Sequence, residues 1–294
     1  MDKSLHVSAS AKINLHLRVG PPTADGFHPL SSWMVTVGLF DKLEFTPADR
    51  PGVRLSCDDP AIPCDASNLI VKTGAALLAA RPELGVTVTL QKRIPVGAGL
   101  GGGSADGAFT LMALNHLFGL RQSADELSTL AAQFGSDLSF FFHGPSSICT
   151  SRGEIVNPTP TPKARYAVLI LPGIHMATPA VYRRFDEMGV GDSRTLAQPP
   201  DWKHWATLGA EQLLPLLVND LEMPAFAINE RLSELRDRAE ALLERPVRMS
   251  GSGSTLFSLY DFREEAEILA GRIRLQLSVD ARVVELCPKS NRYG

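Results

Sequence analysis

A run of glycines near residue 100 constrains this chain more than any other feature. Five of the seven residues from 97 to 103 are glycine, inside Pro95-Val96-Gly97-Ala98-Gly99-Leu100-Gly101-Gly102-Gly103-Ser104-Ala105. The pattern predicts a strand over 86–90 before the run and a helix over 104–118 behind it. Glycine lets a backbone turn sharply and approach a ligand, and the N-terminus of a following helix attracts anions. The sequence therefore predicts an anion-binding loop, most often a phosphate site, rather than a flexible linker.

Three familiar phosphate-binding motifs do not account for this loop. A Walker A motif requires a lysine after the glycines, and none follows here. Gly97, Gly99 and Gly102 match G-x-G-x-x-G, but a dinucleotide-binding fold also needs an acidic residue about 20 positions later at a strand end. The candidates, Asp125 and Glu126, are predicted to open a helix instead. The H-R-D and D-F-G segments of protein kinases do not occur.

The loop resembles that of the GHMP kinases (galactokinase, homoserine kinase, mevalonate kinase and relatives), which has the form P-x-x-x-G-L-G-x-x-x-A. Three further segments extend the resemblance over essentially the whole chain: Ala11-Lys12-Ile13-Asn14-Leu15, Ala24-Asp25-Gly26-Phe27-His28 and Met249-Ser250-Gly251-Ser252-Gly253. They are similar to the branch of the family that acts on cytidine diphosphate methylerythritol in non-mevalonate isoprenoid biosynthesis. The resemblance implies an ATP-dependent kinase that phosphorylates the 2-hydroxyl of this small molecule, with ATP and Mg²⁺ as cofactors.

Three segments depart from the usual pattern of that branch. Where the branch reads Gly-Ala-Asp-Val-Pro, this chain has Gly135-Ser136-Asp137-Leu138-Ser139. The loop continues as Ser104-Ala105-Asp106-Gly107 in place of Ser-Ser-Asn/Asp-Ala, and Phe27 replaces the usual tyrosine. None of these differences removes a charged candidate.

The order of predicted elements indicates an α+β fold with two domains. Strands are predicted over 5–19 and 33–45, and Ser123 with Glu126 forms a capping box that opens a helix. Three prolines between 157 and 162 predict a linker, which gives domains 1–160 and 161–294. The second domain has the β-α-β-β-α-β order of a ferredoxin-like (split βαβ) domain. Its strands are predicted at 166–171, 247–249, 255–260 and 281–286, and its helices at 228–242 and 263–277.

The resemblance extends to this domain organisation. It implies a two-domain GHMP-kinase fold, with an N-terminal two-layer α/β domain that binds ATP. The second predicted domain then corresponds to the C-terminal GHMP kinase domain.

Lys12 and Asp137 are the candidate catalytic residues. Lys12 lies in the first predicted strand, either on a solvated face or with its ammonium near the transferred phosphate, where it would supply positive charge. Asp137 precedes an apolar run, and a carboxylate in such surroundings is costly unless it is paired. It is either a helix-capping or turn aspartate or, paired with Lys12, the group that accepts or orients the acceptor proton. The resemblance implies the catalytic pair.

The resemblance also implies the remaining site residues. ATP is expected to contact the loop and two asparagines: Pro95, Val96, Gly97, Ala98, Gly99, Leu100, Gly101, Gly102, Gly103, Ser104, Ala105, Asn68 and Asn115. The substrate is expected to contact Asn14, Phe27, His28 and Tyr182, with the two aromatic rings stacked on cytosine and the histidine at its edge. Ser104 is expected to cap the helix or to ligate Mg²⁺. For Asn68 and Asn115, the alternative to an ATP contact is a surface or capping role.

The composition indicates which kinds of binding partner and which cellular compartment to expect for this protein. Lys+Arg 29 against Asp+Glu 32 gives a net charge of −3, which disfavours nucleic acid. Four cysteines without zinc-ligand spacing predict free thiols in a reducing compartment. No apolar run approaches the roughly 20 residues of a membrane span, and the N-terminus lacks the apolar segment of a signal peptide. We therefore expect a cytoplasmic monomer or weak homodimer with no nucleic-acid or membrane partner.

Two alternative functions stay open at this point. One is another small-molecule kinase of the same family, of the homoserine or mevalonate type. The other is a catalytically silent binding protein with the same fold. The presence of Lys12, the whole glycine loop and Asp137 argues against the silent protein.

Overall fold

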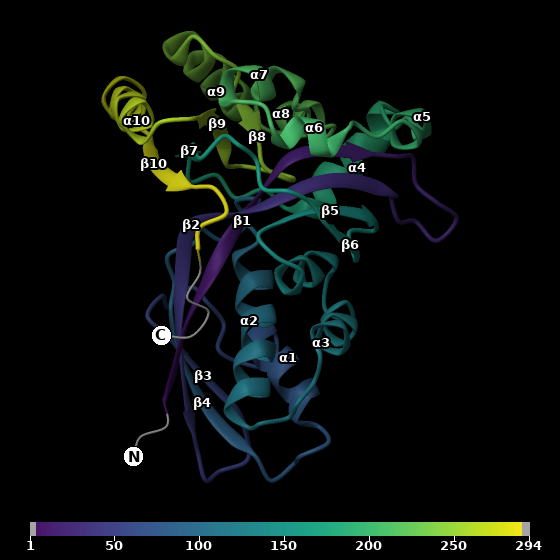
Figure 1. Ribbon diagram of the computed structural model, residues 1–294, viewed down its shortest axis with the longest axis vertical. Coiled ribbons are helices and arrows are strands. Elements are labelled where there is room, and N and C mark those ends of the chain that lie inside the picture. The colour runs from purple at the N-terminus through teal and green to yellow at the C-terminus, as the bar shows by residue number, and fades with distance from the viewer. Residues whose placement is uncertain (1–3, 290–294) are drawn as a thin grey trace.

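Two β-sheets, one from each half of the chain, organise the structure (Figure 1). It is a computed structural model that describes residues 4–289. The first sheet has six strands in the order β3-β4-β2-β5-β6, with β1 paired to β2. These strands are β1 (Leu5–Val19), β2 (Leu30–Pro47), β3 (Gly52–Cys57), β4 (Gly85–Gln91), β5 (Ser146–Ser151) and β6 (Ile155–Pro158).

The long antiparallel pair β1–β2 carries the first polar side chains of the site. Side chains alternate along a strand, so Ala11, Ile13 and Leu15 enter an apolar core. Lys12 and Asn14 therefore point the other way, and both are 3% exposed. Polar side chains buried at this depth need hydrogen-bond or charge partners, and neighbouring side chains at the cavity supply them.

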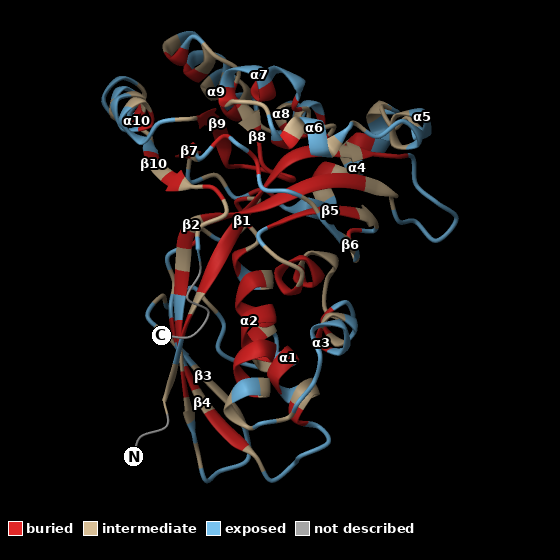
Figure 2. Ribbon diagram, in the orientation of Figure 1, coloured by how far each residue is buried: buried red, intermediate tan, exposed pale blue. Residues whose placement is uncertain are grey.

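Helices α1 (Leu69–Leu78) and α2 (Gly102–Leu117) pack on the first sheet, and α3 (Ala124–Ala131) and the 3₁₀ helix η1 (Ser136–Phe142) pack against α2. Every residue of α2 from 105 to 114 is buried, as Figure 2 shows in red. The side chains of this helix are mostly small or apolar on all of its faces, which is typical of a helix at the centre of a domain. Such a helix holds its N-terminus, where the glycine loop ends, in a fixed position.

The second sheet has the strand order β10-β7-β9-β8. Its strands are β7 (Tyr166–Leu171), β8 (Arg248–Met249), β9 (Leu256–Tyr260) and β10 (Asp280–Glu285), and all neighbours are antiparallel. Helix α9 (Glu230–Leu243) connects β7 to β8 after several shorter helices, and α10 (Arg263–Leu277) connects β9 to β10. This order is that of a ferredoxin-like domain, so the predicted fold class is confirmed.

One apolar core joins the two sheets. Ile13 and Trp33 of the first sheet pack in the same cluster as Leu169 and Phe257 of the second. The segment 157–162, predicted as a linker, is part of the packed structure: β6 includes Pro158, and Ala164, which follows the segment, is 0% exposed. The division at residue 160 separates the sheets, and it stays a prediction as a domain boundary.

Other differences from the predicted elements are local. The helix predicted at 228–242 is observed as α9 (Glu230–Leu243). It starts two residues later than predicted, because Ile228 ends α8 and Asn229 caps α9 by accepting a hydrogen bond from the Leu232 backbone amide. The capping box of Ser123 and Glu126 is confirmed. The strands β3 and β5 were not predicted. The remaining short elements are α4 (Thr178–Met188), α5 (Ser193–Ala197), α6 (Trp202–Ala206), α7 (Ala210–Leu213), η2 (Leu214–Leu216) and α8 (Glu222–Ile228).

Within residues 4–289, none of these helices has the length and apolar character needed to cross a membrane.

Candidate active site

A cavity of about 450 Å³ lies between the two halves of the chain. The glycine loop, Lys12, Asn14 and Asp137 line it from the first half. Tyr182 of α4 and the turn 251–253 line it from the second half. The structure therefore brings the segments that the sequence singled out to one place.

The glycine loop has the backbone geometry that its sequence predicts. Gly97, Gly99 and Gly101 have φ of +64°, +76° and +66°, a region that other residues rarely adopt. The Lys12 amide donates a hydrogen bond to the Leu100 carbonyl at 2.9 Å, which ties the loop to β1. Helix α2 begins directly after Gly101, so the amide groups of its first turn face the cavity. This arrangement can bind an anion.

The second glycine-rich turn packs against the first. The Ser250 hydroxyl accepts a hydrogen bond from the Asn14 amide at 3.1 Å and donates one to the Gly99 carbonyl at 2.9 Å. The Thr255 amide donates to the Ala98 carbonyl at 3.1 Å. A Cβ atom on Gly99 would lie 2.1 Å from the Ser250 carbonyl oxygen, so only glycine fits there. The approach of the two turns thus depends on a missing side chain.

Lys12 and Asp137 form an ion pair at the wall of the cavity. The Lys12 Nζ lies 3.1 Å from an Asp137 carboxylate oxygen and donates a hydrogen bond to Asn14 Oδ1 at 2.7 Å. Asn14 in turn donates from Nδ2 to the Ser32 hydroxyl at 2.8 Å. Both side chains line the cavity, and the carboxylate is the more accessible of the two, because the side chain of Asp137 is 37% exposed while that of Lys12 is 4% exposed.

The predicted substrate residues are only partly brought together. Tyr182 lines the cavity, and its ring lies 5.0 Å from that of His28, centroid to centroid. Burial raises the pKa of the Tyr182 hydroxyl. His28 donates from Nδ1 to the Gly20 carbonyl at 3.0 Å, and its Nε2 lies 3.4 Å from Asp186. Its ring atoms therefore already have protein partners.

Phe27 lies outside the cavity lining and is 51% exposed. The guanidinium of Arg152 lies over its ring, 3.9 Å from the centroid, and also pairs with Asp25. The loop that carries Phe27 is thus held by the β5–β6 turn.

The two asparagines differ in position. Asn68 lines the cavity at the N-terminus of α1, where Oδ1 accepts from the Ile70 amide at 2.9 Å and Nδ2 donates to the Pro63 carbonyl. Asn115 lies near the other end of α2, about 20 Å from Gly102 at 1.5 Å per residue. Its amide group hydrogen-bonds the backbone of Gln122 at 2.9 Å in both directions. The structure does not bring Asn115 to this site, because its side chain holds the turn into α3.

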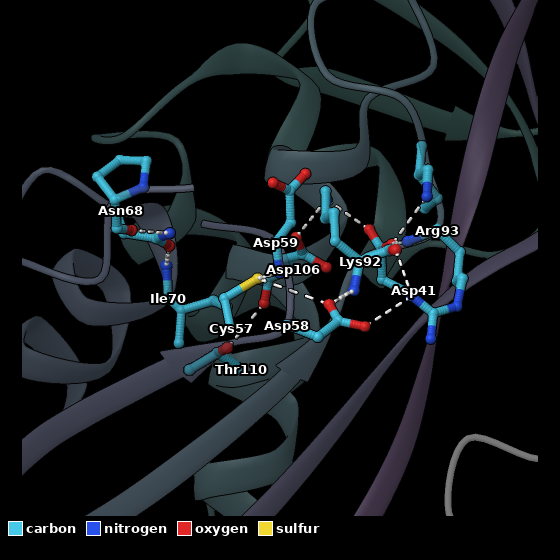
Figure 3. Close-up of polar contacts among 12 residues, drawn as sticks. Asp41, Cys57, Asp58, Asp59, Asn68, Ile70, Lys92, Arg93, Asp106 and Thr110 are labelled. Carbon is cyan, nitrogen blue, oxygen red and sulfur yellow. Dashed lines mark hydrogen bonds and ion pairs between the residues drawn. The ribbon is translucent and has the colours of Figure 1, made fainter. Parts of the chain in front are cut away.

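One group of charged side chains in the cavity wall was not predicted from the sequence. Lys92 Nζ lies 2.5 Å from Asp41 and 2.7 Å from Asp106. Figure 3 draws the three side chains together. Burial raises the pKa of Asp106 to about 8. The signal that could have identified the group is a charged residue inside a strongly apolar element, Asp41 in β2 and Asp106 in α2.

Two families match parts of the chain. Residues 68–145 match the GHMP kinases N terminal domain, and residues 201–278 match the GHMP kinases C terminal domain. Both matched segments contain elements that line the cavity: the glycine loop in the first and the turn 251–253 in the second.

Curated relatives align over nearly the whole chain. The 4-diphosphocytidyl-2-C-methyl-D-erythritol kinase of Synechococcus sp. (strain CC9902) is 36% identical over 290 residues, which cover 93% of each chain. The kinase of the same name from Syntrophus aciditrophicus (strain SB) is 35% identical over 276 residues, covering 91% of this chain and 95% of the relative.

Solved structures agree with these relatives. The crystal structure of a 4-(cytidine 5'-diphospho)-2C-methyl-D-erythritol kinase superposes with a TM-score of 0.77 at 32% identity, over 96% of this chain and 99% of that chain. Homoserine kinase from Cytophaga hutchinsonii superposes with a TM-score of 0.72 at 19% identity, over 97% and 95% of the chains, which is a likeness of fold alone. The chain therefore belongs to the GHMP kinases, among the 4-diphosphocytidyl-2-C-methyl-D-erythritol kinases.

Proposed function

We propose that this enzyme transfers the γ-phosphate of ATP to the 2-hydroxyl of 4-diphosphocytidyl-2-C-methyl-D-erythritol, giving the 2-phosphate and ADP. The observation that carries the proposal is the Lys12–Asp137 pair, 3.1 Å apart, which lines one cavity together with the glycine loop. The experiment that tests it is ATP turnover by the purified protein with this substrate, with homoserine and with mevalonate. Turnover of only the cytidylyl substrate is expected, and turnover of another acceptor or nucleotide binding without turnover would replace the proposal.

The two ends of the cavity suit the two ligands. Ile62, Pro63 and Leu69 line one end with Asn68, and apolar side chains of this kind suit the adenine of ATP. The phosphates then meet the amide groups at the start of α2. Tyr182 lines the other end, where its ring suits the flat cytosine. Phe27 is proposed to contribute a second stacking surface from the adjoining loop.

The transfer can be derived from the residues that face the acceptor. The substrate oxygen attacks the γ-phosphorus, the bond to the β-phosphate oxygen breaks, and the proton of the hydroxyl passes to Asp137 or is oriented by it. Lys12 neutralises charge on the transferred group, and the low exposure of its side chain strengthens that interaction. Asn14 fixes the Lys12 ammonium by accepting its hydrogen bond, and its side chain lines the cavity beside it.

Mg²⁺ fits this cavity as a partner of ATP. Within residues 4–289 no group of three or more acidic, histidine or cysteine side chains could hold a metal ion. Mg²⁺ is usually bound through substrate phosphates, waters and one or two protein oxygens, so the Ser104 hydroxyl in the cavity wall is the proposed protein ligand. When bound, the ion neutralises charge on the phosphates.

We also propose a cytoplasmic location and a monomer or weak homodimer. The four cysteines are free thiols, as expected of a reducing compartment.

The first prediction concerns the phosphate loop. Gly101→Val should raise the ATP KM at least tenfold, because φ is +66° there and a Cβ would lie 2.9 Å from two stem carbons of Lys12. Gly271→Ala on α10, away from the cavity, is the control, since its Cβ would meet only Arg274 Nη2 at 3.9 Å. Steady-state kinetics on variants with native circular dichroism make the comparison, and equal ATP KM values would remove the loop from the site.

The second prediction concerns the transfer step. Asp137→Asn should lower kcat by roughly 10²-fold or more while ATP binding is kept, because the amide cannot accept the proton. Lys12→Ala should also lower kcat. Asp237→Asn, an exposed carboxylate on α9, serves as the control and should leave kcat unchanged. A kcat for Asp137→Asn within a few-fold of wild type would make Asp137 a turn residue.

The third prediction concerns the cytosine. Base–aromatic stacking is worth about 1–3 kcal/mol, so Tyr182→Ala should raise the KM for the cytidylyl substrate roughly 10- to 100-fold. Tyr182→Phe keeps the ring and should stay near wild type, and the ATP KM should not change in either variant. Phe27→Ala, measured in parallel, tests the second stacking surface. Unchanged substrate KM in both alanine variants would place the base elsewhere.

A further inference from the structure

The ring of His28 packs against α4, the helix that carries Tyr182 into the cavity. His28 belongs to the loop between β1 and β2 in the first half of the chain, and α4 belongs to the second half. The His28 side chain is 7% exposed. Its ring contacts Tyr182 but does not line the cavity, so it lies behind the tyrosine. This contact therefore joins the two halves of the chain directly beside the cavity wall that Tyr182 forms.

Three residues of α4 receive the imidazole ring. Its centroid lies 5.0 Å from that of Tyr182 and 5.6 Å from that of Phe185. Its Nε2 lies 3.4 Å from a carboxylate oxygen of Asp186. These residues are spaced i, i+3 and i+4, so they share one face of the helix. Phe185 is 1% exposed and holds that face in the core, while Asp186 supplies the charged contact.

Both ring nitrogens of His28 face oxygen atoms that can accept a hydrogen bond. Nδ1 donates to the Gly20 carbonyl at 3.0 Å, because a carbonyl oxygen only accepts. With a proton on Nδ1, the Nε2 of a neutral ring would present a lone pair to the Asp186 carboxylate, whereas a protonated ring donates to it. The Asp186 side chain is 43% exposed, so water weakens the pair without removing it. One backbone carbonyl and one carboxylate thus fix the plane of the His28 ring.

We propose that Asp186 is a positioning residue for the cytidylyl substrate. It holds the His28 ring against Tyr182, and the His28 ring in turn holds the Tyr182 ring in the plane on which the cytosine stacks. In the part of the chain that the structure describes, the Tyr182 hydroxyl has no hydrogen-bond partner, so contacts of the ring set its orientation. A ring that is already fixed loses less entropy when the base binds. The inference rests on the proposed function, which places cytosine at Tyr182.

The neighbouring charged groups are paired with other residues. Glu187, the next residue of α4, pairs with Arg184 of the same helix at 3.1 Å. In the loop that carries His28, Asp25 pairs with Arg152. Asp186 is therefore the carboxylate that acts on the imidazole, and Glu187 offers a matched control with a similar side chain on the same helix.

The first test compares steady-state kinetics of Asp186→Ala, Asp186→Asn and Glu187→Ala. The KM for the cytidylyl substrate should rise about three- to tenfold in Asp186→Ala, while kcat and the ATP KM are kept. Asp186→Asn should recover most of that loss, because its amide nitrogen can donate to Nε2 of a neutral ring. Glu187→Ala should match the wild type. If Tyr182→Ala raises the substrate KM and Asp186→Ala does not, the proposal is overturned.

A double variant separates positioning from a general loss of packing. If Asp186 acts through the tyrosine ring, Tyr182→Ala with Asp186→Ala should have the same substrate KM as Tyr182→Ala alone. A further rise as large as that of the single Asp186→Ala variant would show that Asp186 acts independently of Tyr182, and would overturn the proposal.

A fluorine NMR measurement needs no substrate. The chain has four tyrosines, so labelling with 3-fluorotyrosine gives few resonances, and the Tyr182 resonance is the one that Tyr182→Phe removes. Asp186→Ala should shift this resonance more than Glu187→Ala does. A resonance that Asp186→Ala leaves unchanged would overturn the proposal. A shifted resonance in a protein that does not turn over the cytidylyl substrate would support the positioning role and count against the proposed kinase function instead.

Discussion

The packing of the elements around the cavity depends on the buried ammonium of Lys12, which must be paired. Lys12 lies in the middle of β1 and is 3% exposed, and an isolated charge at that depth would be far more costly than an apolar side chain. It is accommodated because Asn14 and Asp137 offer oxygen atoms at 2.7 and 3.1 Å. One partner lies two residues away on the strand, and the other lies on η1, beyond α2 and α3. Strand, helix and 3₁₀ turn must therefore pack in one way to satisfy one charge.

The second half of the chain completes that arrangement through buried polar contacts. Ser250 links the Asn14 amide to the Gly99 carbonyl, and Asn219 donates from Nδ2 to the Met249 and Gly251 carbonyls at 2.8 and 2.7 Å. A polar network in which each member has partners is rigid and specifies one arrangement, whereas a partly satisfied one is unfavourable. Together with the apolar core that both sheets share, these contacts fix the two glycine turns against each other. The cavity is therefore a property of both halves.

Much of the fold followed from local signals, and the failures have a common physical cause. The capping box at Ser123 and the glycine loop depend on neighbours in sequence, so they could be predicted. Strand β5 is rich in serine and shows no apolar alternation, and its buried Ser146 is satisfied by the indole of Trp33, 113 residues away. Asn115 illustrates the same cause: a resemblance assigned it to ATP, but its side-chain amide hydrogen-bonds the backbone of Gln122, and it does not line the cavity. Partners of buried polar groups are set by the tertiary fold.

The two lysine–carboxylate groups beside the glycine loop show where sequence reasoning stops. The Asp137 side chain is 37% exposed, whereas those of Asp41 and Asp106 are 0% and 5% exposed. A group that exchanges a proton with a substrate must reach the cavity, while a group that only holds structure interacts more strongly when water is excluded. Both lysines adjoin apolar strands and look alike in the sequence. The exposure of their carboxylate partners differs between the two groups because it is decided by where α2 and η1 pack.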